Sequence, residues 1–393
     1  MKDWFARNSR KIFLFFICFI LLAGAWATEK ILAWKADTYK SGITRVIRLR
    51  EVEPRFYGKF TPTDDEMRMS DTLVRKGYRV RTDTDGFIMP SRIHDRADLT
   101  LAFLGGSTTA CYYVDEEDRF PCLAGRLLEK DTNLKVNSYN SGVGGNYSLH
   151  SLDILLNKLI PLKPDIVVMM HNINDLTVLL FASHDSYWSK DFKKGNTSPL
   201  VVLKKRYVDL PLIVEDYFPH LHNALKNLEK NVRRTLRPQK AARQDDELRD
   251  IRGRRIVINK DYLVNEFKMN LQMFINICRA RNIAPVLMTM ANRLQENPDP
   301  LAIRLTQGLE MDHGITYKQY KDIFDLFNET IRQTGAANGV LVIDLAPAIP
   351  QEKEYIYDLV HFTKLGSQLA SVVIKENLKR HLSSLKPISS RMQ

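Results

Sequence analysis

"DIVVMM" at residues 165–170 is an apolar run behind a single aspartate, and the polar residues "HNIND" follow it at 171–175. A strand without polar alternation is expected where both faces of a sheet are covered, as in a parallel sheet. Working outward, three further apolar runs lie at 99–104, 284–290 and 339–345, with segments of helical periodicity between them. Alternating strands and helices predict a doubly wound, flavodoxin-like α/β fold, in which ligands bind beyond the carboxyl ends of the strands.

The other elements follow from the same periodicities. Residues 77–91 combine alternation with an Asp-Gly turn, which predicts a hairpin or an entry strand, and 291–315 predicts a loop region. No repeat at a fixed period is present, so one large domain or two modest ones fit the 393 residues. The remaining expected elements are a strand at 134–142 and helices at 120–130, 149–159, 262–281, 316–334 and 363–381.

The N-terminus carries basic residues ahead of an apolar segment. Lys2, Arg7, Arg10 and Lys11 precede an uncharged run at 12–27. The basic end is expected to stay in the cytoplasm while the rest of the chain crosses the membrane. Two interpretations fit the run: a secretory signal cleaved near its small residues, or an uncleaved single-pass anchor, which we favour. Both place the rest of the chain outside the cytoplasm, in the periplasm or at the cell surface.

The chain therefore divides into four parts. Residues 1–11 form a basic cytoplasmic tail, 12–28 the transmembrane anchor or signal segment, 29–76 a juxtamembrane stalk, and 77–385 the α/β domain. A basic insertion is expected within that domain at about 178–260. Such a charged run is usually a solvated surface, and a basic rim facing membrane lipid or an acidic glycan is the alternative.

The net charge of +12 suits an anionic partner: nucleic acid, membrane headgroups or acidic polysaccharide. Export would remove nucleic acid from that set.

The part of the chain expected to be exported contains three cysteines, Cys111, Cys122 and Cys278, and their odd number leaves at least one of them free. A Cys111–Cys122 disulfide remains open at this point. No His/Cys cluster has zinc-ligand spacing, so neither a metal nor a cofactor is expected.

Three polar segments follow strands and offer groups for acyl chemistry. Ser107 in "LAFLGGSTTA" stands at a strand-to-helix turn, where glycines allow a tight backbone; an ordinary N-cap serine is the alternative. "NSGVGGNYS" at 140–148 exposes backbone donors that can hold an oxyanion, and a plain loop is the alternative. Asn174 in "MMHNIND" ends the most apolar strand with a side-chain amide, and a turn or cap is the alternative.

The fourth segment, "YDLVHFTKLG" at 357–366, places Asp358 and His361 three residues apart. A nucleophilic serine needs a nearby base, and the base needs an orienting carboxylate. His361 is therefore predicted to accept the proton of Ser107, with Asp358 fixing the tautomer and stabilising the cation. Taken alone, an Asp-x-x-His pair is more often a chance pair on the protein surface than a catalytic dyad.

Together, the four segments resemble the ordered blocks of the SGNH (GDSL) hydrolase family, over roughly residues 77–380. They read "GGSTT", "NSGVGG", "NIND" and "DLVH", and "GYRVRTDTDGF" upstream is similar to the entry segment of the bacterial membrane-linked or secreted branch with a "GGSTT" block. The resemblance implies an SGNH hydrolase fold with Ser107, Asp358 and His361 as the triad. It also implies an oxyanion hole of the Ser107 N–H, the Gly145 N–H and the Asn174 amide, with Gly142 or Gly144 as weaker choices of glycine.

Two departures from the family pattern stand out. The first block reads Gly-Gly-Ser rather than Gly-Asp-Ser, and Asn172 occupies the position where a glycine is usual. We expect the second difference to affect the shape of the substrate site more than catalysis.

These observations predict an extracytoplasmic serine esterase that removes O-acetyl or other short acyl groups from cell-envelope or exported polysaccharide. An O-acyltransferase or a lipid esterase on the same fold remains open. The alternative from another class is a catalytically inactive module that binds glycan or acts as a scaffold. The partners expected are thus an acylated glycan or lipid and the membrane, with no nucleic acid.

Overall fold

The computed structural model describes residues 2–36, 49–181, 186–188 and 253–385, with a few positions between 218 and 228. The chain separates into two compact units, residues 1–41 with 199–246, and residues 42–198 with 247–393. Each is described by itself. The expected basic insertion at 178–260 lies mostly outside the described residues and stays a prediction.

The second unit is built on a parallel five-stranded sheet in the order β4-β3-β5-β6-β7. Counted along the chain this order is 2-1-3-4-5, which confirms the predicted doubly wound fold. Every residue of β3, β4 and β5 is buried apart from Thr100, so both faces of these strands are covered. The strands are β3 (Leu99–Gly105), β4 (Val136–Asn140), β5 (Ile166–Met170), β6 (Ala284–Met288) and β7 (Leu341–Ile343).

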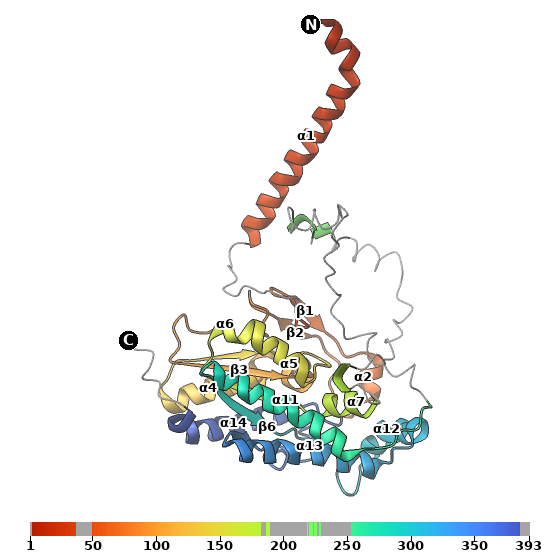
Figure 1. The fold of residues 1–393 in the computed structure, drawn as a ribbon, viewed down its shortest axis with the longest axis vertical. Coiled ribbons are helices and arrows are strands. Elements are labelled where there is room, and N and C mark those ends of the chain that lie inside the picture. The colour runs from red at the N-terminus through yellow and green to blue at the C-terminus, as the bar shows by residue number, and fades with distance from the viewer. Residues whose placement is uncertain are drawn as a thin grey trace. The chain divides into compact units, whose positions relative to one another are not determined.

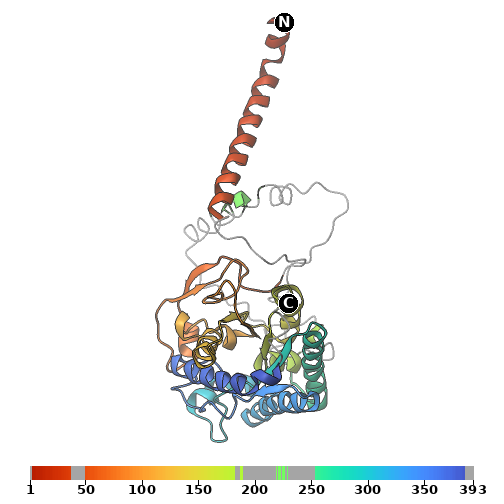
Figure 2. The ribbon, with the colours of Figure 1, turned by 90° about the vertical axis from the view of Figure 1, so that its left-hand side faces the viewer.

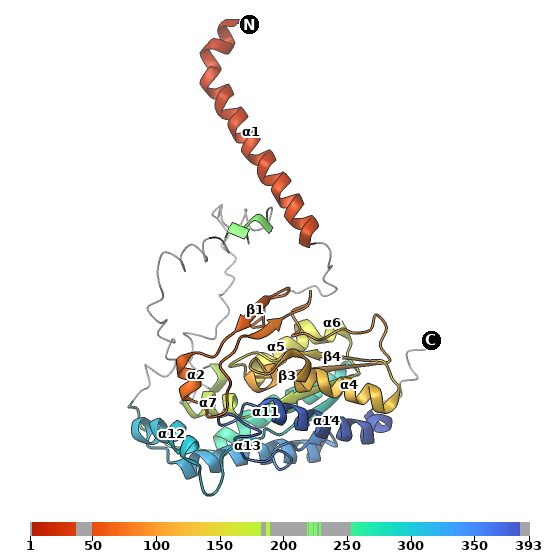
Figure 3. The ribbon, with the colours of Figure 1, turned by 180° about the vertical axis from the view of Figure 1, so that it is seen from behind.

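Helices pack on both faces of this sheet. On one face α4 (Phe120–Thr132) packs against α14 (Lys364–Leu385). On the other, α11 (Lys260–Ala280) packs against both α5 (Ser148–Ile154) and α13 (Tyr317–Asn338) (Figures 1 and 3). The apolar stripes of these helices and the strands form one contiguous core, on which the carboxyl edge of the sheet is built.

Two helical predictions need correction. Residues 291–315 are not a loop throughout, because α12 (Pro300–Gly308) and a π-helix (Leu309–His313) lie within them. Asp299 caps α12 by accepting from the Ala302 N–H at 2.8 Å, and Pro300 has the backbone angle of a first helical residue. The helix expected at 149–159 divides into α5, a π-helix (Leu155–Leu159) and α6 (Ile160–Leu162).

The expected stalk over 29–76 also differs from the structure in its second half. Residues 57–60 form β1 (Tyr57–Phe60), which pairs antiparallel with β2 (Tyr78–Arg81), and α2 (Asp64–Arg68) follows β1. Residues 49–76 therefore fold with the α/β unit, because β1 supplies the partner that β2 needs. The Asp-Gly turn near residue 85 is present, closed by an isolated bridge between Thr82 and Ile88.

Within the first unit, α1 (Lys2–Ala36) is a single uninterrupted helix (Figure 2). Its segment Asn8–Leu32 is long and apolar enough to cross a membrane, and the large apolar side chains from Phe13 to Leu22 are exposed. A signal sequence has the same length and composition, so both interpretations of this segment remain.

Candidate active site

The site lies at the carboxyl edge of the sheet, where β3 and β5 are neighbours. Chain connections leave β3 and β5 in opposite directions, and such a switch point is where doubly wound folds bind ligands. Ser107 follows β3 and opens the short helix α3 (Ser107–Ala110), while Asn174 lies in the first turn of α7 (Ile173–Phe181) after β5.

The two glycines before Ser107 are required by close packing. A Cβ on Gly105 would lie 2.1 Å from Oγ1 of Thr109 and 2.8 Å from the carbonyl oxygen of Met170. A Cβ on Gly106 would lie 2.6 Å from Nδ2 of Asn174. The sequence "GG" is therefore what lets the turn bring the serine beside the asparagine amide.

The loop between β7 and α14 delivers the other two predicted triad residues. An isolated bridge between Ile356 and Phe362 closes this loop, and Asp358 stabilises it from inside. Its Oδ1 accepts from the backbone N–H groups of Val360 and His361, at 2.9 and 2.8 Å. These bonds fix the carboxylate and leave Oδ2 to face the imidazole.

Ser107, His361 and Asp358 form one hydrogen-bonded chain. Oδ2 of Asp358 lies 2.6 Å from Nδ1 of His361, and Nε2 of His361 lies 2.7 Å from Oγ of Ser107. The ring of Tyr357 stacks on the imidazole with centroids 5.6 Å apart and an angle of 11° between the planes. Stacking and the carboxylate together hold the ring in the orientation that proton transfer from the hydroxyl needs.

The electrostatics of the pair favour a charged imidazolium. Burial opposes protonation of His361, but the Asp358 carboxylate outweighs burial and raises the pKa of His361 above its usual value. Burial likewise disfavours the carboxylate of Asp358, yet the imidazole and the two backbone N–H groups lower the pKa of Asp358 overall. The site can therefore accommodate the positive charge that appears on the base when the serine is deprotonated.

The glycine loop, residues 141–147, lies beside Ser107 and Asn174. Its Gly142 N–H donates to Oδ1 of Asn140 at 2.9 Å, and its Gly144 N–H donates to the Tyr112 hydroxyl at 3.4 Å. Within the described residues, the N–H of Gly145 has no hydrogen-bond partner. Of the three glycines, Gly145 is thus the one with a donor to spare, and its φ of +74° favours glycine.

Asn174 is bound to the glycine loop through one of its two amide hydrogens. Its Nδ2 donates to the carbonyl oxygen of Asn146 at 2.8 Å, which leaves the second hydrogen for another acceptor. Asn172, the departure from the family pattern, points elsewhere. Its Nδ2 donates to the Phe324 carbonyl and to Oδ1 of Asn328, both at 3.0 Å, so it links β5 to α13.

A second Ser-His-Asp set is buried behind the glycine loop. Oγ of Ser151 lies 2.7 Å from Nε2 of His171, and Nδ1 of His171 lies 3.4 Å from Oδ2 of Asp175. Burial lowers the pKa of His171 to about 3 and raises the pKa of Asp175 to about 6. Because Ser151 and Asp175 are fully buried, no substrate reaches them, and this set stabilises the fold.

The three cysteines of this unit are buried free thiols, so the structure has no Cys111–Cys122 disulfide. Burial raises the pKa of Cys111 to about 12 and that of Cys122 to about 11, which makes both thiols unreactive.

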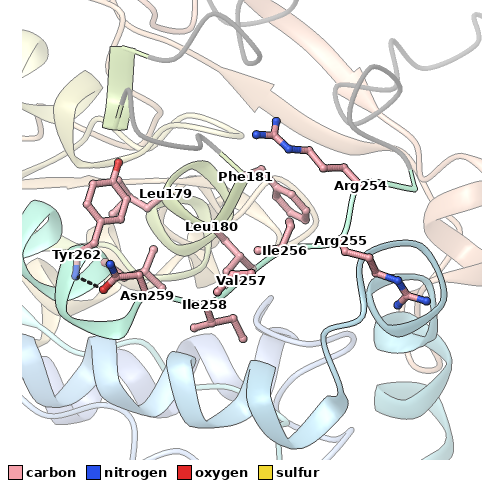
Figure 4. Close-up of a pocket in the computed structure, with 11 residues that line it drawn as sticks. Leu179, Leu180, Phe181, Arg254, Arg255, Ile256, Val257, Ile258, Asn259 and Tyr262 are labelled. Atoms are coloured by element: carbon pink, nitrogen blue, oxygen red, sulfur yellow. Dashed lines mark hydrogen bonds between the residues drawn. The ribbon is translucent and has the colours of Figure 1, made fainter.

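A separate cavity opens where the end of α7, residues 254–259 and the first turn of α11 meet (Figure 4). None of the predicted site residues lines it.

Sequence reasoning missed Arg50, which lies against the glycine loop. Nη1 of Arg50 donates to Oδ1 of Asn146 at 2.8 Å. No sequence signal singles out one arginine in a segment that resembles a stalk. Tyr112 and Tyr357 flank the glycine loop and the imidazole and were also missed, because nothing in the sequence marks a tyrosine next to a motif as part of the site.

We expect Gly106→Ala to lower kcat by ~10²–10³-fold, the cost typical of losing one oxyanion-hole donor. The new Cβ would displace Nδ2 of Asn174, only 2.6 Å away, while a φ of −86° leaves the backbone unstrained. Steady-state kinetics with p-nitrophenyl acetate and the thermal midpoint would be measured together. Gly77→Ala is the matched control, because its Cβ would meet nothing closer than 3.4 Å. Wild-type kcat in Gly106→Ala would argue against a role for this amide.

Comparison with known proteins identifies the family. The model of the GDSL-like lipase/acylhydrolase family matches residues 103–369. No curated protein matches the chain.

Similar solved structures include a lipase/acylhydrolase from Enterococcus faecalis, 18% identical over 72% of this chain and 96% of its own, with a TM-score of 0.39. An acetyl xylan esterase variant from Geobacillus stearothermophilus is 14% identical over 72% and 94%, also at 0.39. An α/β hydrolase from the metagenome of Lake Arreo is 15% identical over 74% and 97%, again at 0.39. The match of the family model over most of the chain decides the assignment: the protein belongs to the GDSL-like lipase/acylhydrolase family and is a serine ester hydrolase.

Proposed function

We propose that the protein is a membrane-anchored, extracytoplasmic esterase that removes O-acetyl or other short acyl groups from anionic envelope or exported polysaccharide. The observation that carries the catalytic part is the unbroken chain from Oγ of Ser107 through His361 to Asp358, at 2.7 and 2.6 Å. The basic tail ahead of the apolar helix supports the location, and the net charge of +12 supports an anionic substrate.

The reaction would proceed by two acyl transfers. Oγ of Ser107 attacks the ester carbonyl while Nε2 of His361 takes the hydroxyl proton, and the carbonyl oxygen becomes an oxyanion. The N–H groups of Ser107 and Gly145 and the amide of Asn174 donate to that oxyanion. His361 then gives its proton to the departing alkoxide, which leaves an acyl-serine. Water, deprotonated by His361, attacks the acyl group, the bond from the acyl carbon to Oγ breaks to release the carboxylic acid, and His361 returns the proton to Oγ of Ser107.

We expect the full-length protein in detergent to release acetate faster from an O-acetylated uronic-acid polysaccharide than from a neutral O-acetylated xylan. The preference should weaken as salt is raised from 20 to 500 mM, because screening shortens the reach of surface charge (about 3 Å at 1 M). Acetate would be measured enzymatically, with Ser107→Ala as the blank. Equal, salt-independent rates on the two glycans would remove the case for an anionic substrate.

The same assay separates the remaining activities. Acetate release without any added alcohol identifies hydrolysis, whereas acyl-serine that turns over only with a glycan acceptor identifies acyl transfer. Faster release of fatty acid from a lysophospholipid than of acetate from either glycan would identify a lipid esterase. A chain that binds glycan without turnover and fails to react with a fluorophosphonate at Ser107 would be an inactive binding module.

A further inference from the structure

Arg50 precedes the region that the family model matches, yet it lies against the proposed oxyanion site. Arg50 and Asn146 bind each other reciprocally: Nη1 of Arg50 donates to the Asn146 side-chain oxygen at 2.8 Å, and Nδ2 of Asn146 donates to the Arg50 carbonyl at 3.3 Å. Asn146 is fully buried, so these two bonds fix its side chain, while its own backbone N–H donates to the Val143 carbonyl at 3.0 Å.

Arg50 is connected to both other proposed donors, to Asn174 through Asn146 and to Gly145 by direct packing. The Asn146 carbonyl accepts from Nδ2 of Asn174 at 2.8 Å, which sets the direction of that amide. A Cβ on Gly145 would lie 3.0 Å from Nη2 of Arg50, so the guanidinium packs directly on the residue with the unpartnered N–H. Arg50 thus contacts one proposed donor and is one residue removed from the other.

The charge of Arg50 affects the pKa values of the groups around the glycine loop. Burial and then the guanidinium charge lower the pKa of His150 to about 3, so this imidazole is neutral. The phenol of Tyr112 has a pKa raised by burial, and the Gly144 N–H and the Arg50 charge oppose that rise. The loop therefore lies in a positive field, and the same field would favour an oxyanion formed beside it.

A buried ion pair anchors the backbone next to Arg50. Oε2 of Glu51 lies 2.8 Å from Nζ of Lys158, and their side chains are only 9% and 1% exposed. Lys158 also donates to the Gly86 carbonyl at 2.7 Å, and its ammonium lies 4.3 Å from the centroid of the Phe87 ring. Breaking such a pair leaves an uncompensated buried charge, so the segment is held in place and Arg50 with it.

We propose that Arg50 is a positioning residue of the oxyanion hole. It is supplied by the segment that precedes the region matched by the family model. It orients Asn146, which orients the Asn174 amide, and it holds Gly145 in place. This inference rests on the proposed esterase mechanism. It assigns to this chain a positioning residue, Arg50, in addition to the residues of the four blocks.

The test compares Arg50→Ala with Arg55→Ala, which removes the same charge from an exposed position on the same segment. In the full-length protein, Arg50→Ala should lower kcat on p-nitrophenyl acetate by ~10–10²-fold, less than the ~10²–10³-fold typical of losing a donor outright. KM should change by less than about threefold, since the lost interaction acts in the transition state. Arg55→Ala should retain wild-type kinetics.

Two readouts go beyond a general loss of packing. Added guanidinium ion should restore part of the kcat of Arg50→Ala and should leave the kcat of wild type unchanged. The affinity for an alkylboronic acid, which forms a tetrahedral adduct on Ser107, should weaken by the same factor as kcat/KM, because both depend on the oxyanion donors.

Each outcome decides the proposal. Wild-type kcat in Arg50→Ala overturns it, and so does a rise in KM alone, which would make Arg50 a substrate-binding residue. If Arg50→Ala does not fold, Arg50→Lys decides instead. The lysine ammonium cannot reproduce the planar arrangement of donors of the guanidinium, so kcat should fall. An unchanged kcat in Arg50→Lys overturns the proposal. Inactive wild-type protein would contradict the esterase mechanism itself, and thus remains distinct from a failure of the Arg50 proposal.

Discussion

Replacing Ser107 with alanine should abolish ester hydrolysis, with kcat falling by at least ~10⁴-fold on p-nitrophenyl acetate. In the proposed mechanism the serine oxygen forms the acyl bond, and among the described residues it is the hydroxyl oxygen that lies within hydrogen-bond distance of Nε2 of the base, at 2.7 Å. The variant loses one hydrogen bond, worth about 1 kcal/mol, so its thermal midpoint should stay within ~3 °C of wild type.

Ser151→Ala is the matched control, because Ser151 belongs to the buried Ser-His-Asp set. It should keep most of the turnover but lower the free energy of unfolding by about 1–3 kcal/mol, since it leaves a buried ring nitrogen of His171 without its partner. A fluorophosphonate should label wild type and Ser151→Ala, and leave Ser107→Ala unlabelled. Full activity in Ser107→Ala would refute the serine mechanism.

Asp358→Asn should lower kcat by ~10³–10⁴-fold at neutral pH while leaving the loop folded. The asparagine oxygen can still accept from the backbone N–H groups of Val360 and His361. Its amide nitrogen would then face Nδ1 of His361, where it favours the wrong tautomer and supplies no negative charge. The cost falls on the base, because the imidazolium is no longer stabilised.

The pH profile provides a second measure of the same variant. The base must be neutral to act, so kcat/KM of wild type should rise with pH through an inflection above the ordinary histidine value of about 6.5, since the carboxylate raises the pKa of His361. In Asp358→Asn the carboxylate no longer offsets burial, which lowers the pKa of His361, and only the smaller effect of the Glu66 charge still raises it, so the inflection should move to lower pH. An unmoved inflection would mean that Asp358 does not set the protonation of the base.

The sequence predicted the doubly wound sheet because an apolar run without alternation is a direct signature of burial on both faces. It failed over 291–315, where only Asp299 and Pro300 mark the start of α12. It also failed over 49–76, where β1 pairs with a strand eighteen or more residues away. A four-residue strand such as Tyr57–Phe60 has too few residues for a periodic signal, and its partner defines it.

The candidate site divides in the same way. Sequence alone determined the residue types and their places at strand ends: Ser107 after two glycines, Asn174 after the most apolar strand, and Asp358 three residues before His361. Only the tertiary structure brought His361 to Ser107 across 254 residues, and Arg50 to Asn146 across 96. The physical reason is that burial and backbone conformation select residue types at nearby positions, so the local sequence predicts them. A hydrogen bond between distant segments depends on the register of the packed sheet, and no local sequence pattern predicts it.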